Sequence, residues 1–495
     1  MTPKNKILQE LLVKLKNSKI DYPIALVGSA TTKSEFNDLD LLMIVDDIDK
    51  VKNSILECFK DNEIKLVDDA IKILDYADVE ISIAPYEKTN VERIIKDFLS
   101  GKENLPTHRT WSIGYWMCES FVNNLSEMEI VNDKCDFLKK LQAATKKISP
   151  YAKKRIISEC IEEIEIKKEL IQKYDIESLE YKMLKNDLIL SMIRGIYTCN
   201  NQYIKGFKRI TLLVDNCNKT DKNDILKFIN EGSIESIEII LKTLKESIKW
   251  NNRIYLGTWQ YGGGFKDLSN EEIKNLLQYA KDKGIKKFDT ALVYGKGNVE
   301  KMLSTVIDDN NEVVTKIPAK KKPSNDSDSI ITDYYSYEYM KECVNKSLCN
   351  LNKDRIDTCL LHNWSVDWNK HFEIIEWLLK LKEENLIERI GISLPNGYDN
   401  TLPDEILSCI DVIEAPYNLE NTWIERYIEE YKGYGIEIIL RSLFLQGKTL
   451  RENNTSAEDI IRKAMEMNTS LVIGMTTFDQ IDKNIKEDYI NEEII

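Results

Sequence analysis

Residues 254–290 read IYLGTWQYGGGFKDLSNEEIKNLLQYAKDKGIKKFDT, and their pattern determines the class of structure. The short apolar segments at the two ends, IYLGTW (254–259) and KKFDT (286–290), have the length and composition of buried strands. Between them, EEIKNLLQYAKDKG (271–284) repeats its apolar residues at helical spacing. The pattern predicts a strand, a loop, a helix and a second strand, the unit from which parallel sheets are built.

The same pattern continues to the end of the chain. Six further strands are expected: EVVTKI (312–317), IDTCLLH (356–362), IERIGIS (387–393), VIEAPYN (412–418), IEIILRS (436–442) and SLVIGM (470–475). Helical segments lie between strands, among them MKECVNKSLCNLN (340–352), HFEIIEWLLKLKEE (371–384) and WIERYIEEYKGYG (423–435). Strands and helices alternating in this way over roughly 240 residues predict a (β/α)8 TIM barrel across residues 251–495.

The preceding residues follow two other patterns. Residues 1–145 mix a leading amphipathic helix with strand-like segments such as PIALVGS (23–29), DLDLLMIV (38–45) and DVEISIAP (78–85), which predicts an α+β domain. Residues 146–250 carry long charged segments with helical periodicity and few strand-like runs, which predicts a helical domain. A multidomain α/β protein with three parts is therefore expected.

Composition narrows the class of function. The 495 residues carry a net charge of −14, and an acidic surface repels nucleic acids and anionic lipids, so small-molecule substrates are expected. The N-terminus lacks the apolar core of a signal peptide, and no uninterrupted apolar run is long enough for a membrane span. The ten cysteines show no metal or disulfide spacing. These features predict a cytoplasmic enzyme.

The ends of the predicted barrel strands carry the residues to inspect, because the loops there build the active site in this class of fold. Four polar side chains meet that condition: Asp289, Tyr294, Lys316 and His362. A carbonyl that accepts a hydride needs a proton on its oxygen, and a phenol can supply it if a neighbouring cation favours the phenolate. Tyr294 is the expected donor, with Lys316 as the cation, Asp289 as its counter-ion and His362 as a hydrogen-bond donor to the carbonyl.

These residues lie in runs that resemble the aldo/keto reductases: LGTWQYGGG, FDTALVYGKGNVEKML, TKIP, LLHNW, GIS and RSLFLQG. The resemblance covers about half of the chain. It implies a reductase that holds NADP or NAD extended across the barrel mouth, with Ser393 on the carboxamide of the cofactor. The residues that match the dinucleotide-binding parts are Ser442, Leu443 and Gly447 in one loop and Gly474, Thr476, Gln480 and Asn484 in the last segment, where backbone N–H groups would face phosphate.

The sequence departs from the pattern of that family in three respects. Leu394 replaces an asparagine that often follows the carboxamide serine, and Glu414 stands where many members have a glutamine. No basic residue for a 2′-phosphate is evident in GMTTFDQIDKN (474–484), which leaves NADP and NAD open.

A second group of candidates lies near the N-terminus, in LVGSATTKSEFNDLDLLMIV (26–45). Asp38 and Asp40 fall on one face of a strand, and Glu80, with Asp78 as the alternative, lies on a later strand. Three carboxylates at one sheet edge suit two Mg²⁺ ions that bind a triphosphate. Gly28 would allow close backbone approach to phosphate, and the Ser29 hydroxyl would be a ligand.

This arrangement resembles the polymerase-β type of nucleotidyltransferase, in which a helical domain follows. The resemblance implies transfer of a nucleoside monophosphate from a nucleoside triphosphate to a hydroxyl, with Asp38 and Asp40 on metal and Glu80 on metal or acting as general base. Thr31, Thr32 and Asn37 depart from the commonest pattern of the small members. The aromatic segment 107–120, with His108 and Arg109, is interpreted either as a substrate wall or as a hydrophobic anchor.

Together the two halves predict a bifunctional enzyme that reduces or oxidises one small molecule and nucleotidylates a hydroxyl of a sugar or natural product. The alternative is a sensor or scaffold that binds nucleotide and dinucleotide without turnover at one or both sites. A transferase acting on RNA is disfavoured by the acidic charge. The substrates, the redox direction and the oligomeric state are not determined by the sequence.

Overall fold

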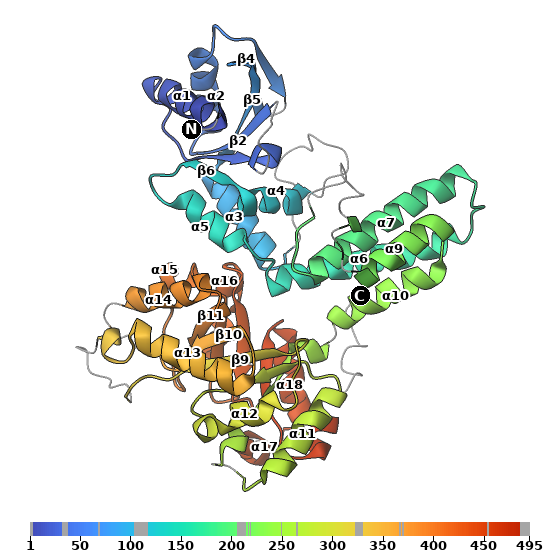
Figure 1. Ribbon diagram of the computed structural model, residues 1–495, viewed down its shortest axis with the longest axis vertical. Coiled ribbons are helices and arrows are strands. Elements are labelled where there is room, and N and C mark those ends of the chain that lie inside the picture. Colours follow the sequence, from blue (N-terminus) through green and yellow to red (C-terminus); the bar gives the residue numbers. More distant parts are fainter. Residues whose placement is uncertain are drawn as a thin grey trace. The chain divides into compact units, whose positions relative to one another are not determined.

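The computed structural model describes residues 3–31, 38–67, 70–102, 117–204, 214–215, 217, 219–248, 250–263, 266–321, 330–365, 368, 371–452 and 455–485. The chain divides into two compact units, Met1–Lys245 and Glu246–Ile495 (Figure 1). Within the described ranges, no helix combines the length and the apolar composition needed to cross a membrane.

The N-terminal unit begins with helix α1 (Pro3–Asn17) and a mixed sheet in the order β3-β4-β5-β2-β1-β6. Only β2 and β5 pair in parallel. The strands are β1 (Ile24–Val27), β2 (Asp38–Val45), β3 (Ile64–Val67), β4 (Ala70–Tyr76), β5 (Val79–Glu87) and β6 (Glu129–Asn132). Helix α2 (Ile48–Cys58) connects β2 to β3 and buries Val51 and Ile55 in the core of this sheet. The predicted strands correspond to β1, β2 and β5, whereas β3, β4 and β6 were not predicted.

Helices make up the rest of this unit. They are α3 (Lys88–Leu99), α4 (Met117–Glu127), α5 (Phe137–Thr145), α6 (Pro150–Ile171), α7 (Leu179–Cys199), α9 (Lys219–Glu231) and α10 (Ile234–Ser247). Helix α6 begins where Ser149 accepts a hydrogen bond from the Ala152 amide, and Pro150 occupies the first helical position, where its missing N–H costs nothing. Glycine at 195 lets α7 approach α10, because a Cβ there would lie 2.8 Å from Leu244 Cδ1.

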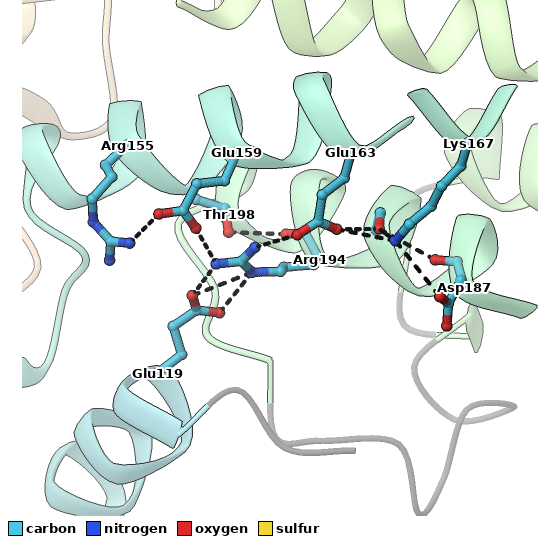
Figure 2. Close-up of polar contacts among 9 residues, drawn as sticks. Glu119, Arg155, Glu159, Glu163, Lys167, Asp187, Arg194 and Thr198 are labelled. Carbon is cyan, nitrogen blue, oxygen red and sulfur yellow. Dashed lines mark hydrogen bonds and ion pairs between the residues drawn. The ribbon is translucent and has the colours of Figure 1, made fainter. Parts of the chain in front are cut away.

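A buried arginine joins three of these helices (Figure 2). Arg194 of α7 is 4% exposed and donates from Nε and Nη2 to the carboxylate of Glu119 on α4. Its Nη2 also lies 2.6 Å from Glu159 of α6, and Nη1 lies 3.7 Å from Glu163. Burial alone would lower the pKa of the guanidinium, but the surrounding carboxylates outweigh burial and raise it. The arginine stays charged, and we name this group, Arg194 with Glu119, Glu159 and Glu163, the arginine cluster.

The C-terminal unit is a closed barrel of eight parallel strands, in the order β10-β11-β12-β13-β14-β7-β8-β9. The strands are β7 (Ile254–Gly257), β8 (Lys287–Asp289), β9 (Glu312–Ile317), β10 (Ile356–Leu361), β11 (Ile387–Ser393), β12 (Val412–Pro416), β13 (Glu437–Arg441) and β14 (Ser470–Gly474). All eight predicted strands are present, and the barrel prediction is confirmed.

Helices follow the barrel strands as expected for this fold. The main ones are α11 (Asn270–Asp282), α12 (Asn298–Ser304), α13 (Tyr337–Leu351), α14 (His371–Glu383), α16 (Ile428–Lys432), α18 (Ala457–Glu466) and α19 (Phe478–Asn484). Two shorter ones are α15 (Asp404–Leu407) and α17 (Lys448–Glu452). Helix α11 begins with a complete capping box between Ser269 and Glu272. Apolar residues of the helices and of the outward strand faces form one large core around the barrel.

The interior of the barrel is layered, because alternate residues of each strand face inward. At the N-terminal ends of the strands, Lys287, Glu312, Arg389 and Glu437 form ion pairs, and we call this the lower charged layer. Above it, Val314, Leu360, Val412 and Ile439 pack with Tyr255 in an apolar layer. At the C-terminal ends of the strands the interior side chains are polar again, and they include the predicted reductase residues.

Candidate active site

The predicted reductase residues come from successive strand ends. Asp289 is the last residue of β8, Lys316 is the fifth of the six residues of β9, and His362 follows β10 directly. Tyr294 begins a short 3-10 helix, η5 (Tyr294–Gly297), five residues after Asp289. Because neighbouring strands are paired in parallel, all four side chains reach the same end of the barrel.

Lys316 is the centre of this group. Its side chain is 1% exposed, contacts the carboxylate of Asp289 directly and lies 3.2 Å from Oε2 of Glu414. The ammonium also donates to the carbonyl oxygen of Thr290 at 3.1 Å. A lysine so far from water is stable only with such partners, and both carboxylates hold it charged. Burial would lower the pKa of Lys316, yet Asp289 and Glu414 outweigh that effect and raise it.

Tyr294 lies beside this lysine. The Nζ atom of Lys316 is 5.7 Å from the centroid of the Tyr294 ring, near enough for its charge to act on the phenol although its hydrogen bonds go elsewhere. The ring of His362 meets that of Tyr294 edge to face, with centroids 6.0 Å apart and an interplanar angle of 80°. The structure therefore brings the four predicted side chains together around one point.

The turn after Tyr294 has an unusual backbone. Gly295, Lys296 and Gly297 have φ values of 54°, 55° and 87°, which place three consecutive residues in the left-handed region. Lysine adopts that conformation at a cost, so the surrounding packing must hold it. A Cβ at Gly297 would lie 2.9 Å from Nδ2 of Asn350, so this position has no room for a larger residue. The turn fixes the direction in which the phenol leaves the chain.

Electrostatics at the site differ from the expectation in one respect. Burial raises the pKa of Tyr294 to about 12, and the opposing effect of Lys316 is smaller. The lysine was expected to lower the pKa of the phenol below its ordinary value, and that expectation is wrong, because the partial burial of the phenol has the larger effect. A protonated Tyr294 is the form that can donate a proton. Burial also lowers the pKa of His362 to about 4, and Lys316 adds to that effect, so the imidazole is neutral near pH 7.

Glu414 and Arg441 extend this group of side chains. Oε1 of Glu414 accepts a hydrogen bond from Ser393 Oγ at 2.9 Å and lies 3.2 Å from Nε of Arg441. Burial and the charge of Glu414 raise the pKa of Asp289, whereas Lys316 and Arg441 outweigh burial and lower the pKa of Glu414. Arg441 was not among the predicted site residues. Its position at the last residue of β13, in the run RSLFLQG, was the available signal.

The residues predicted to bind a dinucleotide lie beyond the strand ends. Ser442 has a φ of 63° and accepts a hydrogen bond from Arg441, and Leu443 is buried. Gly447 has a φ of 84°. A Cβ at Gly474, the last residue of β14, would lie 2.9 Å from Oε1 of Gln260, so a larger residue there would have to displace that side chain. These contacts show where the residues lie, and their role toward a cofactor stays a prediction.

Residues of the last segment predicted to bind a dinucleotide, 474–484, form hydrogen bonds with one another. The Thr476 amide donates to Oε1 of Gln480 at 2.7 Å, and the Gln480 amide donates to Oγ1 of Thr477 at 3.2 Å. Two of the N–H groups expected to face phosphate are thus already used in this structure. Asn484 is buried at the end of α19.

The carboxylates predicted near the N-terminus are only partly brought together. Asp38 and Glu80 are direct partners in the β2–β5 ladder, and Oδ2 of Asp40 lies 3.2 Å from the Cβ position of Gly28, whose φ is 75°. Glu80 forms an ion pair with Lys72. Among the residues that the structure describes, no group of three His, Cys, Asp or Glu side chains is arranged to hold a metal ion.

The other residues predicted for the N-terminal nucleotide site are either placed differently or lie outside the described residues. Asp78 has a φ of 64° in the turn before β5, so it is not on the strand face with Glu80. Gly28 and Ser29 begin the 3-10 helix η1 (Gly28–Thr31), but the side chain of Ser29 lies outside the described residues. Thr32, Asn37, His108 and Arg109 lie outside them as well.

Comparison with known proteins bears on the barrel half. Residues 253–481 match the profile of the Aldo/keto reductase family. The chain is 32% identical over 137 residues to the uncharacterized oxidoreductase YqkF of Bacillus subtilis (strain 168), covering 27% of this chain and 44% of that protein. It is 28% identical over 180 residues to the aldo-keto reductase YhdN of the same organism, covering 36% and 53%. The chain thus spans about half the length of these relatives.

Solved structures similar to part of this chain include two aldo/keto reductases. An aldo-keto reductase, AKR11C1, from Bacillus halodurans is 21% identical with a TM-score of 0.40, covering 48% of this chain and 86% of that one. An aldo/keto reductase from Klebsiella pneumoniae, solved with NADP and acetate, is 19% identical with a TM-score of 0.36, covering 48% and 85%.

Proposed function

We propose that the barrel, of which residues 253–481 match the aldo/keto reductase family, is an NAD(P)H-dependent carbonyl and alcohol oxidoreductase. The observation that carries this proposal is the buried Lys316, held by Asp289 and Glu414 beside the rings of Tyr294 and His362. A cation, a phenol and a neutral imidazole at one strand-end site can polarise and protonate a carbonyl oxygen.

Each side chain has a defined task in this proposal. Tyr294, protonated because its pKa is raised to about 12, gives its phenolic proton to the carbonyl oxygen. His362, neutral because its pKa is lowered to about 4, donates a hydrogen bond that orients the same oxygen. Lys316 stabilises the phenolate left behind, and Asp289 holds the lysine in place. The carbonyl gains one hydride and one proton and becomes the alcohol.

Two features of the site suit a nicotinamide. Oε2 of Glu414 is buried and lies 3.2 Å from Lys316 Nζ, and the same carboxylate interacts with Asp289, so an amide N–H of a ligand would meet a negatively charged acceptor there. Ser393 Oγ stands next to it. A reduced nicotinamide, when bound there, supplies the hydride. We propose NADP or NAD as the cofactor, held by Ser393, Glu414 and the segments around Ser442 and Gly474.

Steady-state kinetics with the full chain test this function. NADPH and NADH oxidation is followed by absorbance against a panel of aldehydes and ketones, and the reverse reaction against alcohols. Tyr294→Phe should lower kcat/KM by about 100- to 10,000-fold, the usual contribution of a general acid. The matched control is Tyr337→Phe, which removes a hydroxyl bonded to Glu384 on the outer surface of the barrel. Equal activity of the two variants would refute the role of Tyr294.

We propose, as a second function, a metal-dependent nucleotidyltransferase in the N-terminal unit. It is supported by Asp38 opposite Glu80 on parallel strands and by Asp40 next to the left-handed Gly28. Mg²⁺ and a nucleoside triphosphate would bind at this edge, with a sugar or natural-product hydroxyl as acceptor. The ion pair between Lys72 and Glu80 would have to open for Glu80 to take part.

Labelled nucleotide transfer to hydroxylated acceptors tests this second function. Activity of the full chain should depend on Mg²⁺ and be lost in Asp38→Asn and Asp40→Asn but kept in Asp49→Asn, a control on helix α2. No transfer by the wild-type protein, or equal transfer by all variants, would remove this half of the proposal. Tight cofactor binding at either site without turnover would instead support the sensor or scaffold alternative.

A further inference from the structure

Glu414 is a buried carboxylate within the candidate active site, so its charge would act on a ligand bound there. Its side chain is 2% exposed and is surrounded by groups that favour a negative charge. Lys316 Nζ lies 3.2 Å from Oε2, Arg441 Nε lies 3.2 Å from Oε1, and Ser393 donates to Oε1 at 2.9 Å. Asp289 also interacts with this carboxylate, and together these groups keep it ionised in a site closed to water.

The proton state of Glu414 follows from these contacts. Burial would raise the pKa of its carboxyl group, but the charges of Lys316 and Arg441 outweigh burial, so the pKa lies below its ordinary value. The carboxylate is therefore negative at neutral pH. Many aldo/keto reductases have a glutamine at this position. A glutamine would match the glutamate in size but would lack its negative charge. Whatever proton state Asp289 takes, Glu414 adds one negative charge to the site.

The position of the reacting ring follows from the chemistry of the proposed function. The hydride goes to the carbonyl carbon and the proton from Tyr294 goes to the carbonyl oxygen, which are bonded to each other. A nicotinamide that reacts here would therefore be held by the same group of side chains as Tyr294, which includes Lys316 and Glu414. The oxidised ring carries one positive charge that the reduced ring lacks.

We propose that Glu414 offsets the positive charges of Lys316 and Arg441, and so shifts binding toward the oxidised nicotinamide and catalysis toward alcohol oxidation, compared with a neutral side chain at this position. The inference rests on the proposed oxidoreductase function and specifies its direction. A buried carboxylate attracts a cation in the same site far more strongly than it would in water. In the favoured direction the alcohol carbon gives a hydride, with its two electrons, to the oxidised ring, and the alcohol oxygen gives its proton to solvent by way of Tyr294.

Binding measurements on the full chain test this inference without turnover. The dissociation constants of NADP⁺, NADPH, NAD⁺ and NADH are measured by calorimetry or fluorescence for the wild type and for Glu414→Gln. The ratio of oxidised to reduced dissociation constants should rise by at least about tenfold in the variant, because one nearby charge is lost. Glu312→Gln, which removes one charge from the lower charged layer at the other end of the strands, should leave that ratio unchanged.

A second variant tests the inference with the opposite sign. Arg441→Gln removes the cation that pairs with Glu414, so the preference for the oxidised form should increase. This variant carries the test if Glu414→Gln does not fold. An unchanged ratio in the variants that fold would overturn the inference and leave the oxidoreductase function intact. Failure of the wild-type protein to bind any of the four cofactors would overturn the oxidoreductase function itself.

Discussion

His362 shows how one partly buried side chain makes stability depend on pH. Its pKa is lowered from an ordinary 6.5 to about 4, chiefly by burial. Between these values the unfolded chain binds a proton that the folded chain does not, so unfolding takes up a proton and stability falls as the pH falls. Below about pH 4 both states are protonated and the effect is complete.

The expected contribution of His362 is up to about 3 kcal/mol, at about 1.4 kcal/mol per pKa unit. His362→Gln should remove it, so the difference in free energy of unfolding between wild type and variant should shift in favour of the variant as the pH falls from 6.5 to 4. Chemical denaturation of both proteins across this pH range gives the comparison. A difference that stays constant with pH would show that the imidazole is not held neutral by burial.

The sequence predicted the position of a single residue correctly where that residue lies at a recognisable strand end, although its role stays a prediction. Asp289, Lys316 and His362 could be found because a buried parallel strand is a continuous apolar run whose end is visible. The ion pair between Lys316 and Glu414 could not be predicted, because it joins strands that become close only when the barrel closes. The upward shift of the Tyr294 pKa also depends on burial, which spacing does not reveal.

At the scale of one element, the turn that follows Tyr294 determines where the phenol lies. Gly297 and Gly263 have the same φ, 87°, but only Gly297 is crowded, with Asn350 Nδ2 2.9 Å from its Cβ position. Gly263→Ala should cost only the backbone strain, on the order of 1 kcal/mol. Gly297→Ala should cost more and should also lower kcat, because Asn350 or the turn must move. Thermal denaturation and steady-state kinetics of both variants test this, and equal effects would contradict it.

The arginine cluster is the corresponding feature of the helices. Glu119→Gln removes a carboxylate that receives hydrogen bonds from a 4% exposed guanidinium, and breaking such a pair costs roughly 3–5 kcal/mol. Glu165→Gln is the control, because Glu165 and its partner Lys245 are both about half exposed and such a pair contributes about 0–1 kcal/mol. Urea denaturation should separate the two variants clearly. Similar losses would mean that the cluster adds little beyond a surface ion pair.

Elements were predictable to the extent that both their faces are buried. The barrel strands were all predicted, and EVVTKI coincides with β9. Strands β3 and β4 were not predicted, because charged side chains interrupt their apolar residues and β3 has no fully buried residue. Asp78 was misplaced for a related reason: the strand begins one residue later than the apolar pattern suggested, and Asp78 belongs to the turn.

At the scale of the whole molecule, the two compact units have separate hydrophobic cores. We therefore expect two unfolding transitions in calorimetry. A nicotinamide cofactor at 100 times its dissociation constant stabilises the unit that binds it by about 2.7 kcal/mol. NADPH or NADP⁺ should raise only one of the two transition temperatures, that of the barrel. A shift of both transitions, or a single transition, would show that the units do not unfold independently.

The layered interior of the barrel has a consequence for how the sequence of this chain can evolve. The lower charged layer ties Lys287, Glu312, Arg389 and Glu437 together, and hydrocarbon from Val314, Leu360, Val412 and Ile439 separates it from the reacting end. The apolar layer therefore keeps the ion pairs that hold the barrel closed apart from the side chains that would carry out the reaction. Loops and side chains at the C-terminal ends of the strands can therefore evolve toward new reactions without disturbing the lower charged layer.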